Sequence, residues 1–309
     1  MTTPQYYNPT DVGQLYVPRT PTAIAEGQAA GLQPASLDTR RVLLLLVDPQ
    51  VDFIHEDGAL AVPGAVDDTR RTIEWIYRHC DTITAIAASL DSHTPIQIFY
   101  PTWWRDAQGN HPAPFTAITA DDVDTGRWQP LYHPEWSRKY VHALEQQAKK
   151  VLMIWPYHTM IGTPGQAIAP ALYEAIAYHA GARAAQPEFL YKGYIDRTEH
   201  YSIMEPEVKV PEEKARGGEL NEAFLQMLAT YDLIYIAGQA KSHCVLETTH
   251  SIIRYFQHQP EVIRRLRLMG DCTSSVAHPE IDFEALANEA ITGFVDQGMK
   301  VVTSADPIG

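Results

Sequence analysis

The residue best placed for covalent chemistry is Cys244. It follows an apolar run, residues 232–237, that has the character of a buried strand, and it precedes residues 245–253, whose apolar spacing is that of a helix. A thiol at the start of a helix lies near the positive end of the helix dipole, which favours the thiolate. Free backbone N–H groups at such a turn can also bind an oxyanion. The pattern therefore predicts a nucleophilic cysteine.

Two charged residues occupy comparable positions in the sequence. Asp48 directly follows the apolar run 42–47, and Lys192 directly follows residues 189–191. Side chains just beyond the strands of a parallel sheet gather at its ligand-binding edge. There a carboxylate can take the thiol proton, and an ammonium group can stabilise the thiolate. The alternative interpretation is a buried, inert Cys244 with two unrelated charges at strand ends.

A second group of residues has the composition of a metal site. Asp91 and His93 are two residues apart and can point the same way from extended chain, and His158 follows in Trp-Pro-Tyr-His. Two imidazoles and one carboxylate leave coordination positions open, as catalytic Zn²⁺ and Fe²⁺ sites do. His55 and His111 are competing ligands on composition alone. The ordinary alternative is an Asp-x-His turn that binds no metal.

Short apolar runs that alternate with helical stretches surround these residues. The expected strands are residues 42–47, 96–100, 188–191, 233–237, 265–269 and 300–303. The expected helices are residues 67–89, 136–149, 165–179, 220–230, 245–257 and 280–297. This alternation predicts an α/β fold with a doubly wound, mostly parallel six-stranded sheet that carries helices on both faces.

The chain divides into an arm and one main domain. Residues 1–40 lack sustained periodicity and are punctuated by Pro and Gly, which predicts an extended N-terminal arm that wraps the domain or is partly mobile. Residues 41–309 form the expected domain. Two stretches within this domain do not fit a minimal alternation of strands and helices. Residues 101–150 are rich in Trp, Pro and Asp, and residues 206–218 are charged. We expect both to be insertions that cover the site or build an oligomer interface.

Composition restricts the classes of function. The chain has 309 residues, of which 45% are hydrophobic, and a net charge of −14, which disfavours binding to nucleic acid or anionic membranes. Three cysteines cannot build a disulfide framework. Cys80 and Cys272 do not lie between an apolar strand and a helix as Cys244 does, and we expect them to be inert. The first twenty residues lack the apolar core of a signal peptide. We expect a cytoplasmic protein that binds a small molecule, with homo-oligomers left open.

Four groups of segments together resemble the isochorismatase-like cysteine hydrolases, and within them the nicotinamidase branch. They occur in the order of that family between residue 42 and about residue 250. The segments are Val47-Asp48-Pro-Gln-Val-Asp52-Phe53 with Gly58-Ala-Leu-Ala-Val-Pro-Gly64, Asp91-Ser-His93-Thr-Pro, Trp155-Pro-Tyr-His158-Thr-Met-Ile-Gly162-Thr163-Pro164-Gly165, and Lys192-Gly193 with Glu199-His-Tyr201-Ser202 and Gly238-Gln-Ala-Lys-Ser-His-Cys244-Val245.

The resemblance implies a role for each catalytic candidate. Asp48 would be the base, Lys192 the stabilising cation and Cys244 the nucleophile. A cis peptide bond would join Gln239 to Ala240, so that the N–H groups of Ala240 and Cys244 form the oxyanion hole. Residues 41–309 would then be an isochorismatase-like hydrolase domain.

The resemblance also implies a metal and a ring-binding site. Asp91, His93 and His158 would bind a divalent metal, with Zn²⁺ expected and Fe²⁺ or Mn²⁺ as alternatives. The metal would hold the pyridine nitrogen of the substrate, and an aromatic residue near Phe53 would stack on the ring. The substrate-binding candidates are Phe53, Trp103 and Tyr201.

Several positions depart from the family pattern and bear on the choice of substrate. Thr159 replaces the usual cysteine after the metal-binding histidine, and Lys241-Ser-His243 replaces Thr-Asp-Tyr before the nucleophile. Gln97 is the nearest counterpart of an extra polar residue that follows the Asp-x-His motif. The pair Trp103-Trp104, in the first insertion, would lie close to the pocket and could change which amide fits.

Three functions are compatible with the pattern. The first is a metal-dependent amidohydrolase that converts nicotinamide, or a related aromatic amide, to acid and ammonia through a thioester. The second keeps Asp48, Lys192 and Cys244 but acts without metal on a ureido, carbamoyl or other small amide. The third is a non-enzymatic binding protein on the same fold. We expect the first, because all three catalytic positions of the resemblance are retained.

Overall fold

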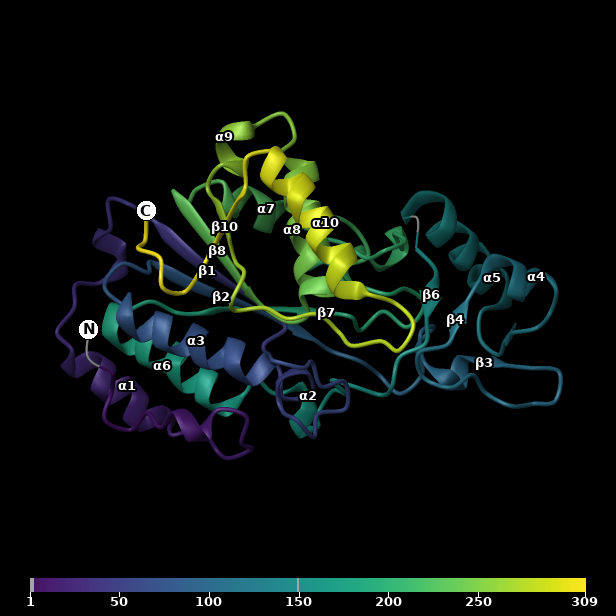
Figure 1. The fold of residues 1–309 in the computed structure, drawn as a ribbon, viewed down its shortest axis with the longest axis horizontal. Coiled ribbons are helices and arrows are strands. Elements are labelled where there is room, and N and C mark those ends of the chain that lie inside the picture. The colour runs from purple at the N-terminus through teal and green to yellow at the C-terminus, as the bar shows by residue number, and fades with distance from the viewer. Residues whose placement is uncertain (1–2, 149) are drawn as a thin grey trace.

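The core of the computed structural model, which describes residues 3–148 and 150–309, is a six-stranded parallel sheet (Figure 1). Its strand order is β10-β9-β8-β1-β2-β7, and every strand pair is parallel. The strands are β1 (Val42–Val47), β2 (Ala85–Asp91), β7 (Glu188–Lys192), β8 (Leu233–Gly238), β9 (Leu266–Met269) and β10 (Lys300–Val302). The expected α/β fold class is confirmed.

Helices cover both faces of the sheet (Figure 1). They are α3 (Ala65–Arg78) and α6 (Pro170–Arg183) on one face, and α7 (Glu222–Leu228), α8 (Leu246–Tyr255) and α10 (Phe283–Asp296) on the other. Because side chains of a strand alternate between faces, Leu44 of β1 belongs to the first core and Leu43 to the second. Within the described ranges, no helix combines the length and apolarity that a membrane crossing needs.

The strand order reverses direction at the centre of the sheet, between β8 and β1. From β1 the chain builds β2 and then β7 on one side, and later returns to add β8 against the other side of β1. Doubly wound sheets bind ligands at such a switch point, beyond the carboxyl ends of the strands. Asp48 directly follows β1, and a π-helical turn, Lys241–Val245, follows β8. The fold therefore brings these two segments to the same edge.

One expected strand is wrong. Residues 96–100 are largely buried but form turns, and the second strand is β2, in a stretch expected to be helical. Its sequence, Ala-Ile-Ala-Ala-Ser-Leu-Asp, is rich in alanine, which favours helices locally. Pairing with β1 on one side and β7 on the other outweighs this preference. Helix α3 accordingly ends at Arg78, well before residue 89.

The N-terminal segment also differs from expectation. Residues 1–40 were expected to be extended, yet they contain helix α1 (Thr20–Ala29), which packs along α6 (Figure 1). Two glycines allow this close approach, since a Cβ atom on Gly181 would lie 2.5 Å from the carbonyl oxygen of Ile24. Gly27 meets the backbone of α6 in the same way. Arg19 adds an ion pair of 2.9 Å to the buried Glu174 of α6.

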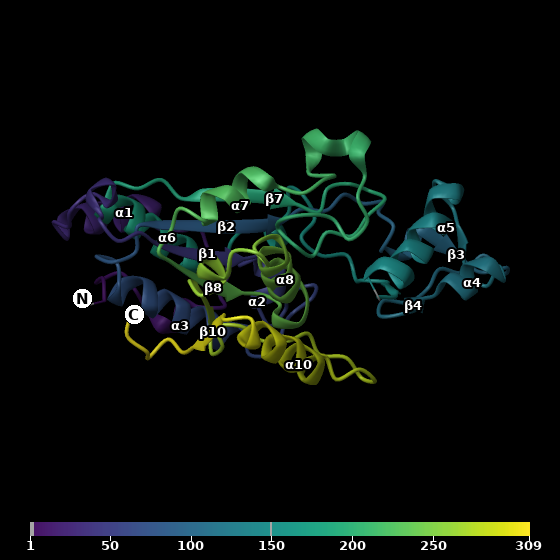
Figure 2. The ribbon, with the colours of Figure 1, turned by 90° about the horizontal axis from the view of Figure 1, so that it is seen from above.

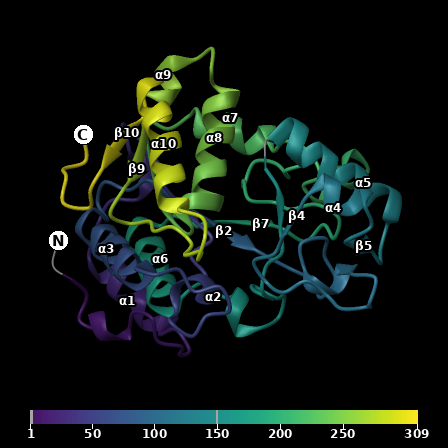
Figure 3. The same ribbon diagram turned by 45° about the vertical axis from the view of Figure 1, so that its right-hand side comes forward.

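Residues 101–148 and 150–153 fold into a lobe set apart from the sheet (Figures 2 and 3). The expected insertion at 101–150 corresponds to this lobe. Its elements are β3 (Trp104–Arg105), β4 (Ala117–Ile118), α4 (Ala120–Asp124), β5 (Gln129–Pro130), α5 (Pro134–Ala143), a π-helical turn (Leu144–Ala148) and β6 (Leu152–Met153). The second expected insertion, residues 206–218, contains a 3-10 helix, Pro211–Arg216.

The remaining helices are short. They are α2 (Val51–Ile54), α9 (Pro260–Ile263) and the 3-10 segments Pro9–Asp11, Ala35–Leu37, Pro101–Trp103 and Pro164–Gln166.

The contact between α1 and α6 predicts a pair of glycine variants with opposite effects. Gly181→Ala should destabilise the fold by about 1–3 kcal/mol, because the added methyl group overlaps the backbone of α1. Gly293→Ala on α10 meets open space and should be neutral or stabilise by up to about 1 kcal/mol. Urea unfolding of both variants measures the difference. Equal stability of the two would contradict the close approach.

Candidate active site

Lys192, the last residue of β7, lies at the centre of a buried cluster of charges. Its Nζ atom is 2.9 Å from Asp48 Oδ2, 3.1 Å from Asp91 Oδ1 and 3.6 Å from Cys244 Sγ. It also donates a hydrogen bond of 2.8 Å to the carbonyl oxygen of His200. The structure therefore brings together the three residues that the sequence selects as catalytic, and joins them to one of the three metal candidates.

Asp48 is held in place by its backbone and by a serine. The residue adopts a positive φ of 42°, which turns the chain sharply at the end of β1. Its N–H donates to Ser89 Oγ at 2.9 Å, and Ser89 Oγ donates in turn to Asp48 Oδ1 at 2.5 Å. These contacts leave Oδ2 directed at Lys192. Ser89 lies in the strand that the sequence assigned wrongly, which is why its role was missed.

Cys244 lies in the π-helical turn Lys241–Val245, directly before α8. The peptide bond between Gln239 and Ala240 is cis, as the resemblance implies. The carbonyl oxygen of Ala240 accepts hydrogen bonds from the N–H groups of His243 and Val245, which closes the turn around the thiol. Cys244 is 6% exposed, so the nucleophile candidate is almost completely shielded from water.

Burial determines the protonation state of this cluster. It raises the pKa of the Cys244 thiol well above its usual value, and the attraction of Lys192 offsets only part of the effect. It also raises the pKa of Asp48, which makes that carboxylate a stronger base. Burial opposes the charge of Lys192, but Asp48 and Asp91 raise its pKa well above normal. Burial therefore opposes the thiolate that the position of Cys244 at the start of a helix favours.

The metal candidates also lie together. Asp91, His93 and His158 each offer a ligand atom, and these atoms lie within 4.8 Å of one another. Asp91 Oδ2 is 2.9 Å from His93 Nε2 and 3.8 Å from His158 Nε2. All three residues are buried. Gly193 is required beside them, because it has a φ of 85° and an added Cβ would lie 2.8 Å from His93 Cε1.

The hydrogen bonds of the two imidazoles fit a bound cation. His93 Nδ1 lies 2.9 Å from the carbonyl oxygen of Gly193, and His158 Nδ1 lies 2.7 Å from that of Pro156. Each Nδ1 must therefore carry a proton and donate it, which leaves the Nε2 lone pairs facing the carboxylate of Asp91. A lone pair facing a carboxylate is unfavourable unless a proton or a metal ion lies between them. Two imidazole nitrogens and one carboxylate oxygen suit Zn²⁺.

The competing ligand candidates are not part of this group. His55 and His111 are absent from the Asp-His-His cluster found in the described part of the chain. His111 Nδ1 lies 2.6 Å from the carbonyl oxygen of Trp104, in the lobe. Gln97 is committed to the backbone, because its amide donates to the carbonyls of residues 193 and 195 and accepts from the N–H of residue 94. Its side chain shapes the loop and has no free oxygen for a metal.

Two of the three substrate-binding candidates lie beside the cluster. Phe53 packs edge-on against the ring of His158, with centroids 5.5 Å apart. The hydroxyl of Tyr201 accepts a hydrogen bond of 3.0 Å from Trp155 Nε1, and its ring lies 5.3 Å from that of His243. Phe53 therefore lies against one of the metal candidates, and Tyr201 lies beside His243, which directly precedes the nucleophile candidate.

Trp103 is placed elsewhere. It is fully buried inside the lobe, where its Nε1 donates to Ser137 Oγ at 2.9 Å and its ring stacks on His133. Trp155, which appeared in the sequence only as part of a motif, lies beside His243, with ring centroids 5.2 Å apart. Glu199 was also missed as a site residue: it is buried nearby, and burial raises its pKa to about 7. A glutamate in an irregular segment carries no pattern that would identify it.

We compared the chain with protein-family models, curated proteins and solved structures. No model of a protein family matches the chain, and no curated protein is similar to it in sequence. Solved structures are similar to it. A nicotinamidase and pyrazinamidase of Acinetobacter baumanii has 18% identity over 87% of this chain and 99% of its own, with a TM-score of 0.55.

Two further structures have the same arrangement. The yeast nicotinamidase bound to the inhibitor nicotinaldehyde has 16% identity over 85% of this chain and 99% of its own, with a TM-score of 0.57. The pyrazinamidase of Pyrococcus horikoshii in complex with zinc has 19% identity over 85% and 99%, with a TM-score of 0.50. At these identities the likeness establishes the fold. The chain has the isochorismatase-like fold of nicotinamidases, as the resemblance implies.

The geometry of the Asp-His-His group predicts that His158→Ala loses zinc. The variant keeps only one imidazole and one carboxylate, so a bound ion that survives dialysis in the parent protein should fall to near zero. His55→Ala is the matched control, since this buried histidine lies outside the group. Metal analysis of both proteins after loading and dialysis gives the result. Full retention of zinc by His158→Ala would refute the site.

Proposed function

We propose that the protein is a cysteine amidohydrolase that hydrolyses a small aromatic carboxamide such as nicotinamide to the acid and ammonia. The observation that carries the proposal is the position of Lys192, whose ammonium contacts Asp48, Asp91 and Cys244 at once. A nucleophile, a base and a stabilising cation in mutual contact are the parts that acyl transfer through a thioester needs.

The first step is attack by sulfur. Burial raises the pKa of the Cys244 thiol, and the negative charges of Asp48 and Asp91 add to this effect. As Sγ forms a bond to the carboxamide carbon, Asp48 takes the thiol proton and the carbonyl electron pair moves onto oxygen. Lys192, which remains an ammonium, balances the charge that this transfer leaves in a buried site.

The developing oxyanion needs donors that are already in place. The N–H groups of Ala240 and Cys244 are the candidates, because both belong to the turn that holds the sulfur atom. Fixed backbone donors in a buried site stabilise an oxyanion without reorganising water. Two observations support this assignment. The turn lies beside the end of β1, and the carbonyl oxygen of Ala240 accepts hydrogen bonds from N–H groups within the turn.

Collapse of the tetrahedral intermediate completes acylation. The C–N bond breaks, Asp48 returns its proton to the departing nitrogen, and ammonia leaves. Water then gives a proton to Asp48 and attacks the thioester, the C–S bond breaks, and the proton returns to Sγ as the acid leaves. One carboxylate therefore acts alternately as base and acid, which its raised pKa favours.

The ring of the substrate would lie beside the metal candidates, near Phe53 and Tyr201. Phe53 packs against His158 of the metal group, and Tyr201 packs against His243, which precedes Cys244. A divalent ion held by Asp91, His93 and His158 would supply a Lewis-acid position for a ring nitrogen. The nicotinamidases and pyrazinamidases of the same fold, one of them in complex with zinc, support this choice of substrate class.

The proposal predicts that Cys244→Ala abolishes ammonia release from nicotinamide while leaving the fold intact. The variant loses the only sulfur in contact with Lys192 among the described residues. Cys80→Ala removes another buried cysteine, far from the site, and should retain activity. A coupled ammonia assay with circular dichroism of each protein gives the comparison. Turnover by Cys244→Ala would exclude the thioester route.

Asp48→Asn should lower the turnover rate by roughly 10²–10⁴-fold, the usual contribution of general acid–base catalysis. The parent enzyme needs ionised Asp48, so its rate should fall as the pH drops through the pKa of this group, which lies above the ordinary 3.8. The variant should lack this acid limb. Asp67→Asn, an exposed carboxylate on α3, is the control. A parallel acid limb in Asp48→Asn would show that another group acts as base.

A further inference from the structure

His200 has a buried imidazole whose Nδ1 atom makes no hydrogen bond within the described part of the chain. The residue is 4% exposed. Burial, together with the charge of Lys192, lowers the pKa of the imidazole to about 3, so the ring is uncharged at neutral pH. A buried polar atom without a partner costs free energy, which a hydrogen bond to a ligand would recover.

The ring of His200 lines a cavity of about 680 Å³ beside β7, which lies at one edge of the sheet. None of the catalytic or metal candidates is among the described residues that line this cavity. Tyr191 lines it, and the next residue of β7 is Lys192 of the catalytic cluster. Successive side chains of a strand point to opposite faces, so these two point away from each other. The cavity is therefore separate from the catalytic cluster.

The second insertion, residues 206–218, supplies part of the lining. Lys209, Lys214 and Gly217 of this insertion border the cavity. A Cβ atom on Gly217 would lie 3.5 Å from His200 Cε1, so the insertion passes directly beside the imidazole. The sequence predicted that this segment covers the site or builds an oligomer interface, and the structure places it against the cavity beside His200.

The composition of the lining favours an uncharged ligand. Its charged residues are two lysines and two glutamates, and one of each, Lys214 and Glu219, form an ion pair of 3.1 Å. A ligand with a net charge would lose its hydration there and gain little in return. Tyr191, Tyr194 and Met204 also line the cavity, and these side chains make favourable contacts with aromatic rings.

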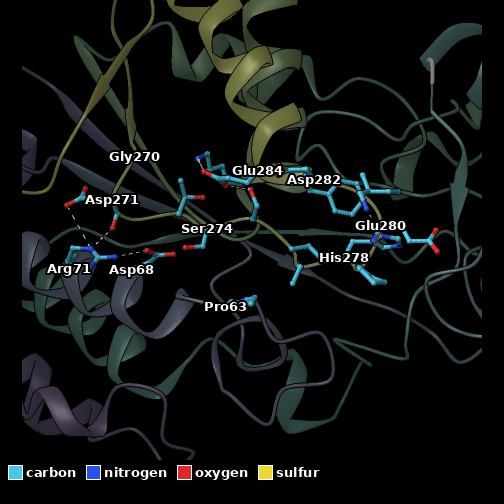
Figure 4. A pocket seen from close by; sticks show the side chains of 18 residues that line it. Pro63, Asp68, Arg71, Gly270, Asp271, Ser274, His278, Glu280, Asp282 and Glu284 are labelled. Carbon is cyan, nitrogen blue, oxygen red and sulfur yellow. Dashed lines mark hydrogen bonds and ion pairs between the residues drawn. The ribbon is translucent and has the colours of Figure 1, made fainter.

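A different cavity, of about 750 Å³, shows a lining whose charges are already paired. It is bounded in large part by residues 270–284 (Figure 4). Figure 4 shows Arg71 joined there to Asp68 and to Asp271. A buried polar atom without a partner in this lining is the hydroxyl oxygen of Thr273. The cavity beside β7 is the stronger candidate for a ligand, because it presents an imidazole nitrogen.

We propose that the cavity beside His200 is a second ligand site, which binds a small uncharged aromatic molecule with an amide group and acts on the catalytic cluster through His200. An amide suits Nδ1 in either tautomer of the imidazole, because the amide carbonyl accepts a hydrogen bond and the amide N–H donates one. The site lies apart from the proposed amidase centre, and binding there does not require amidase activity.

The link from this cavity to the catalytic cluster is one residue long. The carbonyl oxygen of His200 accepts a hydrogen bond of 2.8 Å from Lys192 Nζ, and the same Nζ lies 3.6 Å from Cys244 Sγ. A ligand that holds His200 in place therefore also holds the ammonium group beside the thiol. A cation that is held beside a thiol favours the thiolate, which is the reactive form.

The first experiment measures binding of 2-pyridone, a flat uncharged ring with an N–H and a carbonyl group. His200→Phe removes both ring nitrogens at similar size. Ala223→Trp adds bulk at an exposed lining position of α7, leaves the imidazole intact and serves if His200→Phe disturbs the fold. His55→Phe is the matched control, since His55 is also buried with an unpaired nitrogen but does not line the cavity.

Calorimetric titration should give a dissociation constant about tenfold weaker in both cavity variants than in the parent protein, as expected for loss of a hydrogen bond to a buried group. The control should bind as the parent does. Equal affinity in all four proteins would place the probe elsewhere and overturn the site. Tighter binding of benzoate or benzylamine than of 2-pyridone to the parent would overturn the uncharged class of ligand.

The second experiment measures alkylation of Cys244 by iodoacetamide, located by mass spectrometry of the digested protein. Saturating 2-pyridone should raise this rate about fivefold in the parent and in His55→Phe, a modest coupling between two sites, and should leave it unchanged in the cavity variants. A constant or lower rate in the parent would refute the link through His200. Because neither experiment requires turnover, failure of the amidase proposal would leave both results intact.

Discussion

The structure depends on a single buried ammonium group. Lys192 lies within 3.1 Å of two carboxylates that come from different strands, and it is 2% exposed. Burying Asp48 and Asp91 together without a cation would leave two like charges in a medium that screens them poorly. The ammonium therefore offsets part of the cost of burying these carboxylates, although burial still raises the pKa of Asp48 and of the Cys244 thiol. It also links Asp48 and Cys244 to the Asp-His-His group, because it contacts Asp91.

This arrangement follows from the order of the strands. Because β1 lies between β8 and β2, and β7 lies beyond β2, four consecutive strands deliver their carboxyl ends to one edge. Asp48 follows β1, Asp91 and Lys192 end β2 and β7, and the turn that holds Cys244 follows β8. The register pairs Asp91 directly with Lys192. Aromatic side chains of the lobe and of the start of α10 belong to one hydrophobic cluster with Phe53.

The sequence predicted the parts whose signals are local. Cys244, Asp48 and Lys192 each follow a short apolar run, and two of the metal candidates, Asp91 and His93, lie in a compact motif. Features that depend on distant neighbours were missed. The alanine-rich strand β2 is a strand only because β1 and β7 pair with it, and Ser89 was lost with it. The raised pKa of the Cys244 thiol reflects its burial, which no local sequence pattern indicates. Trp103 points into the lobe because Ser137 binds it there, a contact that no spacing indicates.

The central claim is that Cys244 forms a thioester with the acyl group of an aromatic amide. The most direct measurement is mass spectrometry of protein mixed with nicotinamide and quenched in acid, followed by digestion to locate any adduct. The account predicts an acyl group on the peptide that contains Cys244, absent from the Cys244→Ala protein. Ammonia release without any adduct on Cys244, under conditions where hydrolysis of the thioester is slowed, would contradict it.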